Sequence, residues 1–507
     1  MTFMNAMENE LNNEKQLTEN GAVGYRTTGK KLVDLNFAVS SLRHKTEKEI
    51  VDMFIDTFYE DKILAMKWLF YVADIREGLG ERRTFRVIMN YIADNHSDIA
   101  IAVLRLIPEY NRWDSVVTLL NCNNADVSNE VLSIIKEQLT SDMANMRNHK
   151  PISLLAKWMP SINTSSAKSR KCAKIICHYL GWKEATYRKT LVELRKYLDV
   201  VECKMSAKEW NKINYATVPS NANVKYSKAF MRNDTERRQA YLESLVKGET
   251  KINASVLFPH DVVHKYATRY RYLNPYDEAL EQMWKSLKDM GNIHNTIVVA
   301  DGSGSMTIGV DSTSSVTALE VANALAIYCG ERCSGEFKDK YITFSHRPQL
   351  VNFANANSLH DKLEIALKHN EVSDTNIEAV FYLILKTAIN NNMTQDEIPQ
   401  NILIISDMEF NMATCGKRPD ATLFNNIANK YAEYGYKLPR LIFWNVNSRT
   451  GTIPVKENEC GVALVSGFSV NVLKLVMSGE LDPYKLLVNM LNGERYNAVE
   501  EVISDII

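Results

Sequence analysis

The pattern of apolar residues changes near residue 292, and this change constrains the fold of the 507-residue chain more than any other feature. Before it, from Asn36 to about Gly291, apolar residues recur at the spacing of amphipathic helices, as in EIVDMFIDTFYED and RTFRVIMNYIADN. After it, short β-branched runs alternate with helical segments. Because single domains span roughly 50–250 residues, the sequence predicts two or more domains of different fold class.

The first part is predicted to be a stack of helix pairs. Its amphipathic segments are of similar length and are separated by short polar or glycine-containing breaks. This arrangement favours an α-solenoid of the HEAT type, although an irregular bundle fits the same spacing because the segments share no clear consensus. We expect the HEAT-like domain to span residues 31–290. The polar residues 1–30 are predicted to form a flexible arm.

The second part is predicted to be a doubly wound, mostly parallel, Rossmann-like α/β domain over residues 291–480. Its strands are continuously apolar and alternate with helices, which is typical of a parallel sheet covered on both faces. Residues 481–507 are expected to form one or two closing helices. The predicted strands are NTIVVA, KYITFS, PQLVNF, NILIIS, RLIFWNV and GVALVSG.

Three polar sequences are expected to meet at the carboxyl ends of these strands, where open α/β sheets bind ligands. They are DGSGS after the first strand, DTN before a helix, and SD after NILIIS. An all-oxygen set of this kind suits one divalent cation, foremost Mg²⁺, with Mn²⁺ or Ca²⁺ as alternatives. The competing interpretation is a Gly/Ser turn with a capping aspartate. The predicted metal ligands are Asp301, Ser303, Ser305, Thr375 and Asp407.

DGSGSM, DTNI and ISDMEF, in this order on alternating strands and helices, resemble a von Willebrand factor A (vWA) domain with its metal-ion-dependent adhesion site. The resemblance covers about residues 290–480 and assigns the five ligands named above. One departure concerns the last motif, where the family commonly has Asp-Gly and this chain has Asp407-Met408-Glu409. We expect Glu409 either to add negative charge near the ion or to point to solvent.

A helical-repeat half followed by such a domain resembles the TROVE and Ro-type RNA-binding proteins in architecture. Local sequences resemble a poorly characterised bacterial, phage and plant family of the same layout; they include VPSNANVKYSKAF, LFPHDVV, RLIFWNVN and GVALVSGFS. The first resemblance implies an RNA-carrying helical half, and the second implies no particular activity.

A basic region supports the expectation of RNA. Between Arg147 and Arg238 there are 20 Lys and Arg against 7 Asp and Glu, although the whole chain has a net charge of −1. Aromatic residues are interleaved with these cations, which can neutralise phosphates while exposed rings stack on bases. Trp158, Trp182 and Trp210 are nevertheless expected to be core residues, and an acidic protein partner is the alternative ligand. The predicted RNA contacts are Lys168, Arg170, Lys171, Lys174, Arg188, Lys189, Arg195 and Lys196.

Two smaller motifs are predicted to have structural roles and not binding or catalytic ones. GLGERR at residues 78–83 is interpreted as an inter-helix loop with surface arginines, with a second anion-binding patch as the alternative. His260 and His264 lie four residues apart and could share a metal, but the sequence offers no third ligand. We interpret them as partly exposed residues of a capped helix.

Motifs for catalysis are missing from the sequence. It contains no Walker loop and no G-x-S-x-G elbow. It also has no run of about 18 apolar residues, no secretory signal, and only eight dispersed cysteines. We therefore predict a non-enzymatic, cytoplasmic, ribonucleoprotein-type RNA-binding protein with a divalent-metal adhesion site. The alternatives are a metal-dependent scaffold that captures an acidic residue of a partner and, more weakly, a metal-dependent nuclease or phosphatase.

Overall fold

The computed structural model describes residues 4, 15–269, 272–312, 314–411, 422–455, 461–477, 480 and 482–507. The chain divides into two compact units. We call Met1–Glu49 with Ala254–Met490 the sheet unit, and Ile50–Asn253 with Leu491–Ile507 the helical unit. The fold class predicted from the sequence, a helical region followed by a mostly parallel sheet with helices, is confirmed.

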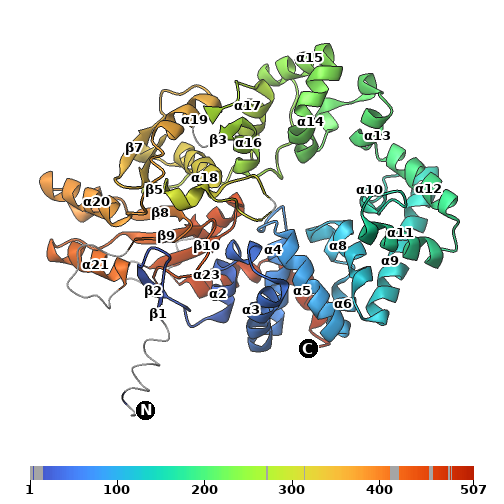
Figure 1. Cartoon of the computed structure of the whole chain (residues 1–507), viewed down its shortest axis with the longest axis horizontal. Helices are drawn as coiled ribbons and strands as arrows, with labels where there is room; N and C mark the ends of the chain where they lie inside the picture. Colours follow the sequence, from blue (N-terminus) through green and yellow to red (C-terminus); the bar gives the residue numbers. More distant parts are fainter. Residues whose placement is uncertain are drawn as a thin grey trace. The chain divides into compact units, whose positions relative to one another are not determined.

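The helical unit consists of helices that follow one another along the chain (Figure 1). α4 is apolar on most sides, with Lys67 as a buried exception, and it is buried on nearly all sides, as a largely apolar helix must be in a globular protein. The helices are α3 (Glu47–Glu60, which begins in the sheet unit), α4 (Lys62–Ala73), α5 (Arg82–Asn95), α6 (Ser97–Val103), α7 (Ile107–Tyr110), α8 (Trp113–Thr118), α9 (Ala125–Arg147), α10 (Leu155–Trp158), α11 (Ala167–Tyr179), α12 (Glu184–Tyr197), α13 (Val201–Ser206), α14 (Ser220–Asn233), α15 (Thr235–Val246) and α24 (Asn497–Ile503).

The end of the chain belongs to the helical unit. α24 packs against α4 and α6, and its Val499 and Ile503 are fully buried. Just before it, Arg495 Nε donates a hydrogen bond of 2.9 Å to Asp74 Oδ2, a carboxylate with no exposed surface. Residues 481–507 were expected to close the chain with helices, and the part from Leu491 onwards does so within the helical unit.

The sheet unit is built on six strands in the order β10-β9-β8-β5-β6-β7. All neighbours are parallel except β7, which is antiparallel to β6. The chain runs from β5 outwards to β7 and then returns to β8 on the other side of β5, so the strand order reverses between β5 and β8. The strands are β5 (Thr296–Asp301), β6 (Lys340–Phe344), β7 (Gln349–Asn352), β8 (Asn401–Ser406), β9 (Arg440–Asn445) and β10 (Val462–Ser466), which matches the six predicted runs.

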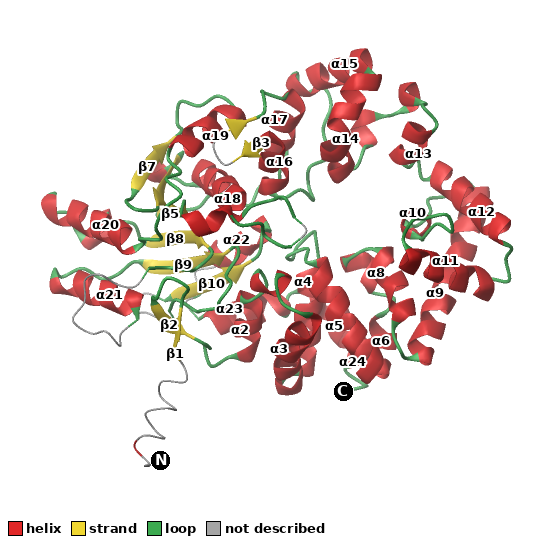
Figure 2. Ribbon diagram, viewed as in Figure 1, coloured by secondary structure: helices red, strands yellow, loops and turns green. Residues whose placement is uncertain are grey.

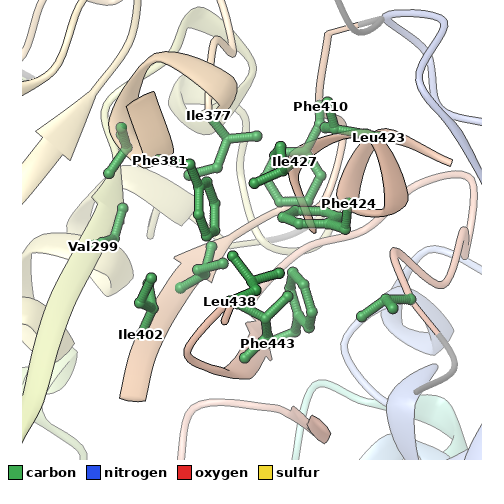
Figure 3. Packing of buried hydrophobic residues seen from close by; sticks show 14 of the residues in the cluster. Val299, Ile377, Phe381, Ile402, Phe410, Leu423, Phe424, Ile427, Leu438 and Phe443 are labelled. Atoms are coloured by element: carbon green, nitrogen blue, oxygen red, sulfur yellow. The ribbon is translucent and has the colours of Figure 1, made fainter. Parts of the chain in front are cut away.

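Helices cover both faces of this sheet (Figure 2). α18 (Ala318–Arg332) contacts β5, β6 and β8. On the other face, α20 (Glu378–Asn390) and α21 (Leu423–Glu433) bury their apolar residues with the strands in one cluster, in which Phe381, Phe424 and Phe443 lie close together (Figure 3). The remaining helices of at least five residues are α2 (Lys31–Phe37), α16 (Pro259–Tyr266), α17 (Glu278–Lys285), α19 (Leu359–Lys368), α22 (Leu473–Met477) and α23 (Pro483–Leu491).

The start of the described chain differs from the predicted arm. Residues 15–25 form a hairpin of β1 (Lys15–Leu17) and β2 (Val23–Tyr25), and Tyr25 bridges to Ile453. Ala22, Val33 and Phe37 are buried in the same cluster as the strands. A Cβ at Gly24 would lie 2.4 Å from Thr452 Cγ2, so glycine permits this close approach. The segment is apolar enough to join the core, whereas residues 1–3 and 5–14 of the predicted arm lie outside the described residues.

The unit boundary also differs from the predicted one at residue 290. Residues 31–49 and 254–290 pack with the sheet rather than with the helices of residues 50–253. α16 illustrates the reason: Val262, Val263 and Tyr266 are buried, and the helix packs on α18. Helical periodicity shows that a segment has an apolar face, but it does not show which neighbour covers that face.

Candidate functional site

The candidate site lies where the strand order reverses. Asp301 is the last residue of β5 and Ser406 is the last residue of β8, its parallel neighbour. Ser406 Oγ donates a hydrogen bond of 2.6 Å to Asp301 Oδ2, and the Ser303 backbone N–H donates one of 2.9 Å to Asp301 Oδ1. This is the position at which doubly wound sheets bind ligands.

The loop after β5 holds its two serines together. The hydroxyls of Ser303 and Ser305 are 3.0 Å apart. A Cβ at Gly302 would lie 2.8 Å from Thr343 Oγ1, so this glycine is needed for close packing against β6. The Gly304 N–H donates a hydrogen bond of 2.9 Å to Ser373 O.

The loop that carries Thr375 is bound to the first loop. Besides the bond to Ser373, Val372 N–H donates to Gly302 O at 3.0 Å. Val372 has a φ of +56°, which is strained for a β-branched residue and is the kind of outlier that gathers at functional sites. Thr375 is buried, and its hydroxyl accepts a hydrogen bond of 3.3 Å from Asn20 Nδ2.

Asp407 and Met408 follow β8 directly. Asp407 is fully buried, and its Oδ1 accepts a hydrogen bond of 3.2 Å from the Glu409 backbone N–H. Met408 has a φ of +63°, which is the left-handed conformation that favours glycine. The vWA pattern commonly has glycine here, so this chain keeps a glycine-like backbone while it buries a methionine side chain.

Glu409 was expected either to add negative charge near the ion or to point to solvent, and the structure contradicts the second alternative. Its carboxylate is fully buried and accepts hydrogen bonds from the backbone N–H groups of Glu19, Arg449 and Thr450, at 2.9 to 3.0 Å. The Thr450 hydroxyl adds a further bond. Glu409 therefore joins the β1–β2 hairpin to the loop after β9. Its neighbour Asn20 donates to Glu409 O at 2.6 Å, which places the hairpin against the site.

Arg449 lies at the candidate site, and the sequence did not predict it there. Its Nη1 lies 3.6 Å from Asp407 Oδ2, and its Nε and Nη2 donate to the two carboxylate oxygens of Glu19 at 2.8 and 2.6 Å. A signal was available, because residue 449 follows β9, which is parallel to β8 and ends at the same edge of the sheet.

The electrostatics of the site depend on two buried carboxylates. Burial raises the pKa of Asp301 above its ordinary range, and hydrogen bonds from Ser303 and Ser406 oppose the shift. Burial also raises the pKa of Asp407, and the nearby charge of Asp301 raises it further, while Ser305 and Arg449 lower it. The mutual effect indicates that both carboxylates and the Ser305 hydroxyl share one small volume.

The predicted RNA-binding residues fall on α11 and α12 and divide into two groups. The Arg195 guanidinium donates to Ala156 O at 2.8 Å, Met159 O at 2.7 Å and Ser161 Oγ at 3.2 Å. Arg170 Nη1 donates to Thr164 O and Ser165 O. Both arginines are half-buried and bind oxygens of the same unit, so they are less available to a ligand than the exposed cations of these helices. Exposed on the two helices are Lys168, Lys171, Lys174, Arg188, Lys189 and Lys196.

The aromatic residues of the basic region are less available than an RNA-stacking surface requires. Tyr187 is fully buried and donates to Pro160 O at 2.8 Å. Trp158, Trp182 and Trp210 are half-buried, and the ring of Trp158 is covered by the Arg112 guanidinium at 4.0 Å. The expectation that these tryptophans pack inside the fold is therefore correct only in part.

The predicted histidine pair and the cysteines do not form metal sites in the described part of the chain. His260 is buried against Phe258 and Phe468, whereas the His264 ring bonds to Glu320, so the two histidines do not converge. Within the described ranges, no three His, Cys, Asp or Glu side chains gather as a metal site of those residues would require. The predicted site has only two acids, and its other donors are hydroxyls. The six cysteines that the structure describes are free thiols.

The known proteins and domains to which this chain is similar have no assigned activity. Residues 295–499 match a domain of unknown function, DUF7788, and residues 126–294 match another, DUF2828. The chain is 29% identical to an uncharacterized protein of Acanthamoeba polyphaga mimivirus over 520 aligned residues, which cover 95% of this chain and 88% of the relative. In the part of the chain that the structure describes, no helix is both long and apolar enough to cross a membrane.

Proposed function

We propose that the sheet unit is a vWA-type ligand-binding domain that holds one divalent cation, and that the helical unit carries RNA. The cation would be held by Asp301, Ser303, Ser305, Thr375 and Asp407. Carboxylate and hydroxyl oxygens are the donors that Mg²⁺ prefers, with Mn²⁺ or Ca²⁺ as alternatives. When bound, the cation supplies a coordination position for a carboxylate or phosphate oxygen of the ligand. The protein would act in the cytoplasm by binding and not by catalysis at these loops.

One observation carries the metal proposal. Asp407 Oδ2 is buried and makes no hydrogen bond within the described residues. Its cationic neighbour, Arg449 Nη1, is 3.6 Å away, which is too long for a hydrogen bond. A buried carboxylate oxygen without a hydrogen bond is unfavourable by several kcal/mol, so an additional cation at this position would reduce the penalty. The fit of the donor set to a hard ion supports the same conclusion.

The RNA proposal is supported by the six exposed cations of α11 and α12. Lys168, Lys171 and Lys174 repeat every three residues and lie opposite the buried Cys172, Ala173 and Ile176 of α11. Such a face can follow a phosphate backbone without reading its sequence. We expect single-stranded RNA to bind through this face, with an affinity that falls steeply as salt is added.

The test is a salt titration of RNA binding. Fluorescence anisotropy with a single-stranded RNA is measured for the wild type, for the triple variant Lys168→Glu, Lys171→Glu, Lys174→Glu, and for the control Lys208→Glu, Lys225→Glu, Lys228→Glu. All six lysines are exposed. The α11 variant should lose roughly 0.7 in the slope of log K against log salt for each removed contact, and the control should keep its slope. Equal loss in both variants, or no binding by the wild type, contradicts the proposal.

A second candidate is a scaffold that captures an acidic residue of a protein partner. It is favoured by one observation: the Glu19 carboxylate already lies beside the site, where it forms two hydrogen bonds to Arg449. A partner's glutamate or aspartate could take a similar position. Proteins that cross-link to the chain are recovered with Mg²⁺ or with EDTA. Acidic-partner capture predicts their loss with EDTA and in Asp301→Ala, whereas RNA bound by α11 and α12 should survive both treatments.

A further inference from the structure

We propose that Ser315, His264 and Glu320 form an activated-serine site that accepts acyl groups from carboxylic esters. Ser315 Oγ lies 3.1 Å from His264 Nε2, and His264 Nδ1 lies 2.7 Å from Glu320 Oε2. A nucleophile within hydrogen-bond reach of a base, with a third group that orients the base, is the signature of covalent catalysis. The site shares no residue with the metal loops and goes beyond the proposed function.

The contacts determine the proton positions on the imidazole. An ionised carboxylate can only accept hydrogen bonds, so His264 Nδ1 carries the proton that is donated to Glu320. In the neutral ring Nε2 then has a free lone pair, which accepts the Ser315 hydroxyl proton. This is the tautomer that a general base needs.

The three groups come from elements that restrain one another. His264 is on α16, Glu320 is in the first turn of α18, and these helices pack together. The Thr317 hydroxyl caps α18 by accepting from the Glu320 backbone N–H at 3.2 Å. Ser315 belongs to the loop before that cap, and the loop is closed by Val310 N–H on Val316 O at 3.0 Å. Helix packing therefore positions His264 and Glu320, and the loop bond from Val310 to Val316 restrains the segment next to Ser315.

Exposure increases from the acid to the nucleophile. The side chains of Glu320 and His264 are 17% and 26% exposed, and Ser315 is exposed. The carboxylate is thus partly shielded from water while the hydroxyl is open to a substrate. Ile308, whose backbone O accepts from Ala318 N–H at 3.1 Å, is 45% exposed and offers an apolar contact for a short acyl chain. The open setting favours small, unhindered esters.

The reaction is a two-step acyl transfer. Ser315 Oγ attacks the ester carbonyl carbon, the Oγ–C bond forms, the ester C–O bond breaks, and the Ser315 proton passes through His264 Nε2 to the leaving alkoxide. Water then attacks the acyl-serine and gives its proton to His264, which returns it to Ser315 Oγ as the acid leaves. The balance is ester plus water to acid plus alcohol.

The test uses a fluorophosphonate, which reacts with activated serines as the Oγ–P bond forms and fluoride leaves. Labelled peptides of the full chain are quantified over time by mass spectrometry. We expect Ser315 to react at least about 100-fold faster than the exposed Ser312 of the same loop. His264→Gln should slow the labelling of Ser315 by on the order of 100-fold, the lower end for general-base catalysis, whereas Ser312→Ala should leave it unchanged.

The labelling rates distinguish a reactive Ser315 from one that only forms a structural hydrogen bond to His264. Equal labelling of Ser315 and Ser312, or unchanged labelling of Ser315 in His264→Gln, would overturn the proposal. If His264→Gln unfolds, Glu320→Gln provides the same comparison, since it removes the charge that orients the base. Release of p-nitrophenol from p-nitrophenyl acetate should be lost in Ser315→Ala and retained in Ser312→Ala.

Discussion

The Arg449 guanidinium lies 3.6 Å from the fully buried Asp407 carboxylate while it also binds both oxygens of Glu19. The two buried acids of the site thus have a cation from their own chain as a neighbour. Because Glu19 is on the β1–β2 hairpin, the same contact links the N-terminal segment to the site. This relationship leads to predictions about metal affinity, stability and pH.

Arg449→Met should tighten the binding of a divalent cation. Without the guanidinium, Asp301 and Asp407 lose a positive neighbour, and a bound cation no longer competes with it. A charge at about 4 Å near a protein surface contributes up to about 4 kcal/mol, so we expect a gain of about tenfold or more in Mn²⁺ affinity, measured by titration calorimetry. The matched control is Arg105→Met, an exposed arginine of the helical unit. Weaker binding in Arg449→Met would show that Arg449 supports the ion.

Glu409→Gln should destabilise the sheet unit by about 2–4 kcal/mol. The amide of glutamine cannot accept hydrogen bonds from all three backbone N–H groups that Glu409 binds. Each buried donor left without a partner is unfavourable by about 1–3 kcal/mol. Hydrogen exchange over residues 15–25 should accelerate in the same variant. The exposed Glu364→Gln should change neither property. Slow exchange in Glu409→Gln would mean that the hairpin is held by its other contacts alone.

In EDTA, the stability of the sheet unit should fall as pH rises from about 4 to neutral. Burial raises the folded-state pKa of Asp301 and Asp407 above the unfolded value near 4. The folded state therefore holds more protons, and the stabilisation present below the unfolded pKa is lost as pH rises through the folded pKa. Melting temperatures between pH 4 and 8 should show this decline.

Two controls separate this effect from a general pH response. Asp407→Asn should flatten the decline, whereas the exposed Asp396→Asn should not. Saturating Mg²⁺ should restore stability at neutral pH in the wild type, because a bound cation favours the ionised carboxylates. A wild-type melting temperature that rises steadily from pH 4 to 7 in EDTA would contradict the prediction.

Arg195→Met should destabilise the helical unit by about 2–4 kcal/mol, because three hydrogen bonds from a charged donor to α10 and the loop after it are lost. The exposed neighbour Lys196→Met should change stability by less than about 0.5 kcal/mol. RNA binding should show the reverse pattern: Lys196→Met should reduce the slope of log K against log salt, and Arg195→Met should leave that slope unchanged. Urea unfolding and anisotropy measure the two effects.

Gly78→Ala should destabilise the turn between α4 and α5 by roughly 3 kcal/mol or more. A Cβ at this position would lie 1.9 Å from Tyr71 O, so the backbone must move. Gly248→Ala is the control for backbone strain alone, since Gly248 has a φ of +74° and no atom within 4 Å of the added Cβ. We expect that control to lose only about 1 kcal/mol. Equal losses in urea unfolding would contradict the packing argument.

Local patterns predicted much of this fold because their causes are local. The strand NILIIS is continuously apolar since both faces of the sheet are covered, and its position as β8 follows from that pattern. Asp301 and Ser406 could be placed at one edge from the direction of parallel strands. The turn at GLGERR was also predicted from its glycines. The steric requirement for glycine at position 78 could not be predicted, because it depends on the nearby Tyr71 O.

Long-range pairings could not be predicted from these patterns. Glu19 and Arg449 are 430 positions apart, and nothing near either residue indicates the other. The sequence of the last residues likewise predicts an amphipathic helix. The position of Arg495 beside Asp74 could not be predicted, because the two residues are more than 400 positions apart. Arg195 shows the same limit for charge: the sequence of a basic helix does not show which cations bind the fold, and the Arg195 guanidinium donates to the carbonyl oxygens of Ala156 and Met159.

The most direct test of the metal site is anomalous diffraction from crystals of the full chain grown with Mn²⁺ in place of Mg²⁺. The account predicts one anomalous peak bonded to oxygens of Asp301, Ser303, Ser305, Thr375 and Asp407, directly or through water, with bonds within the roughly 2.0–2.6 Å range of Mg²⁺ and Ca²⁺ sites. Asp301→Ala should lose that peak. A wild-type crystal with no peak among these residues at millimolar Mn²⁺, or with the peak unchanged in Asp301→Ala, would contradict it.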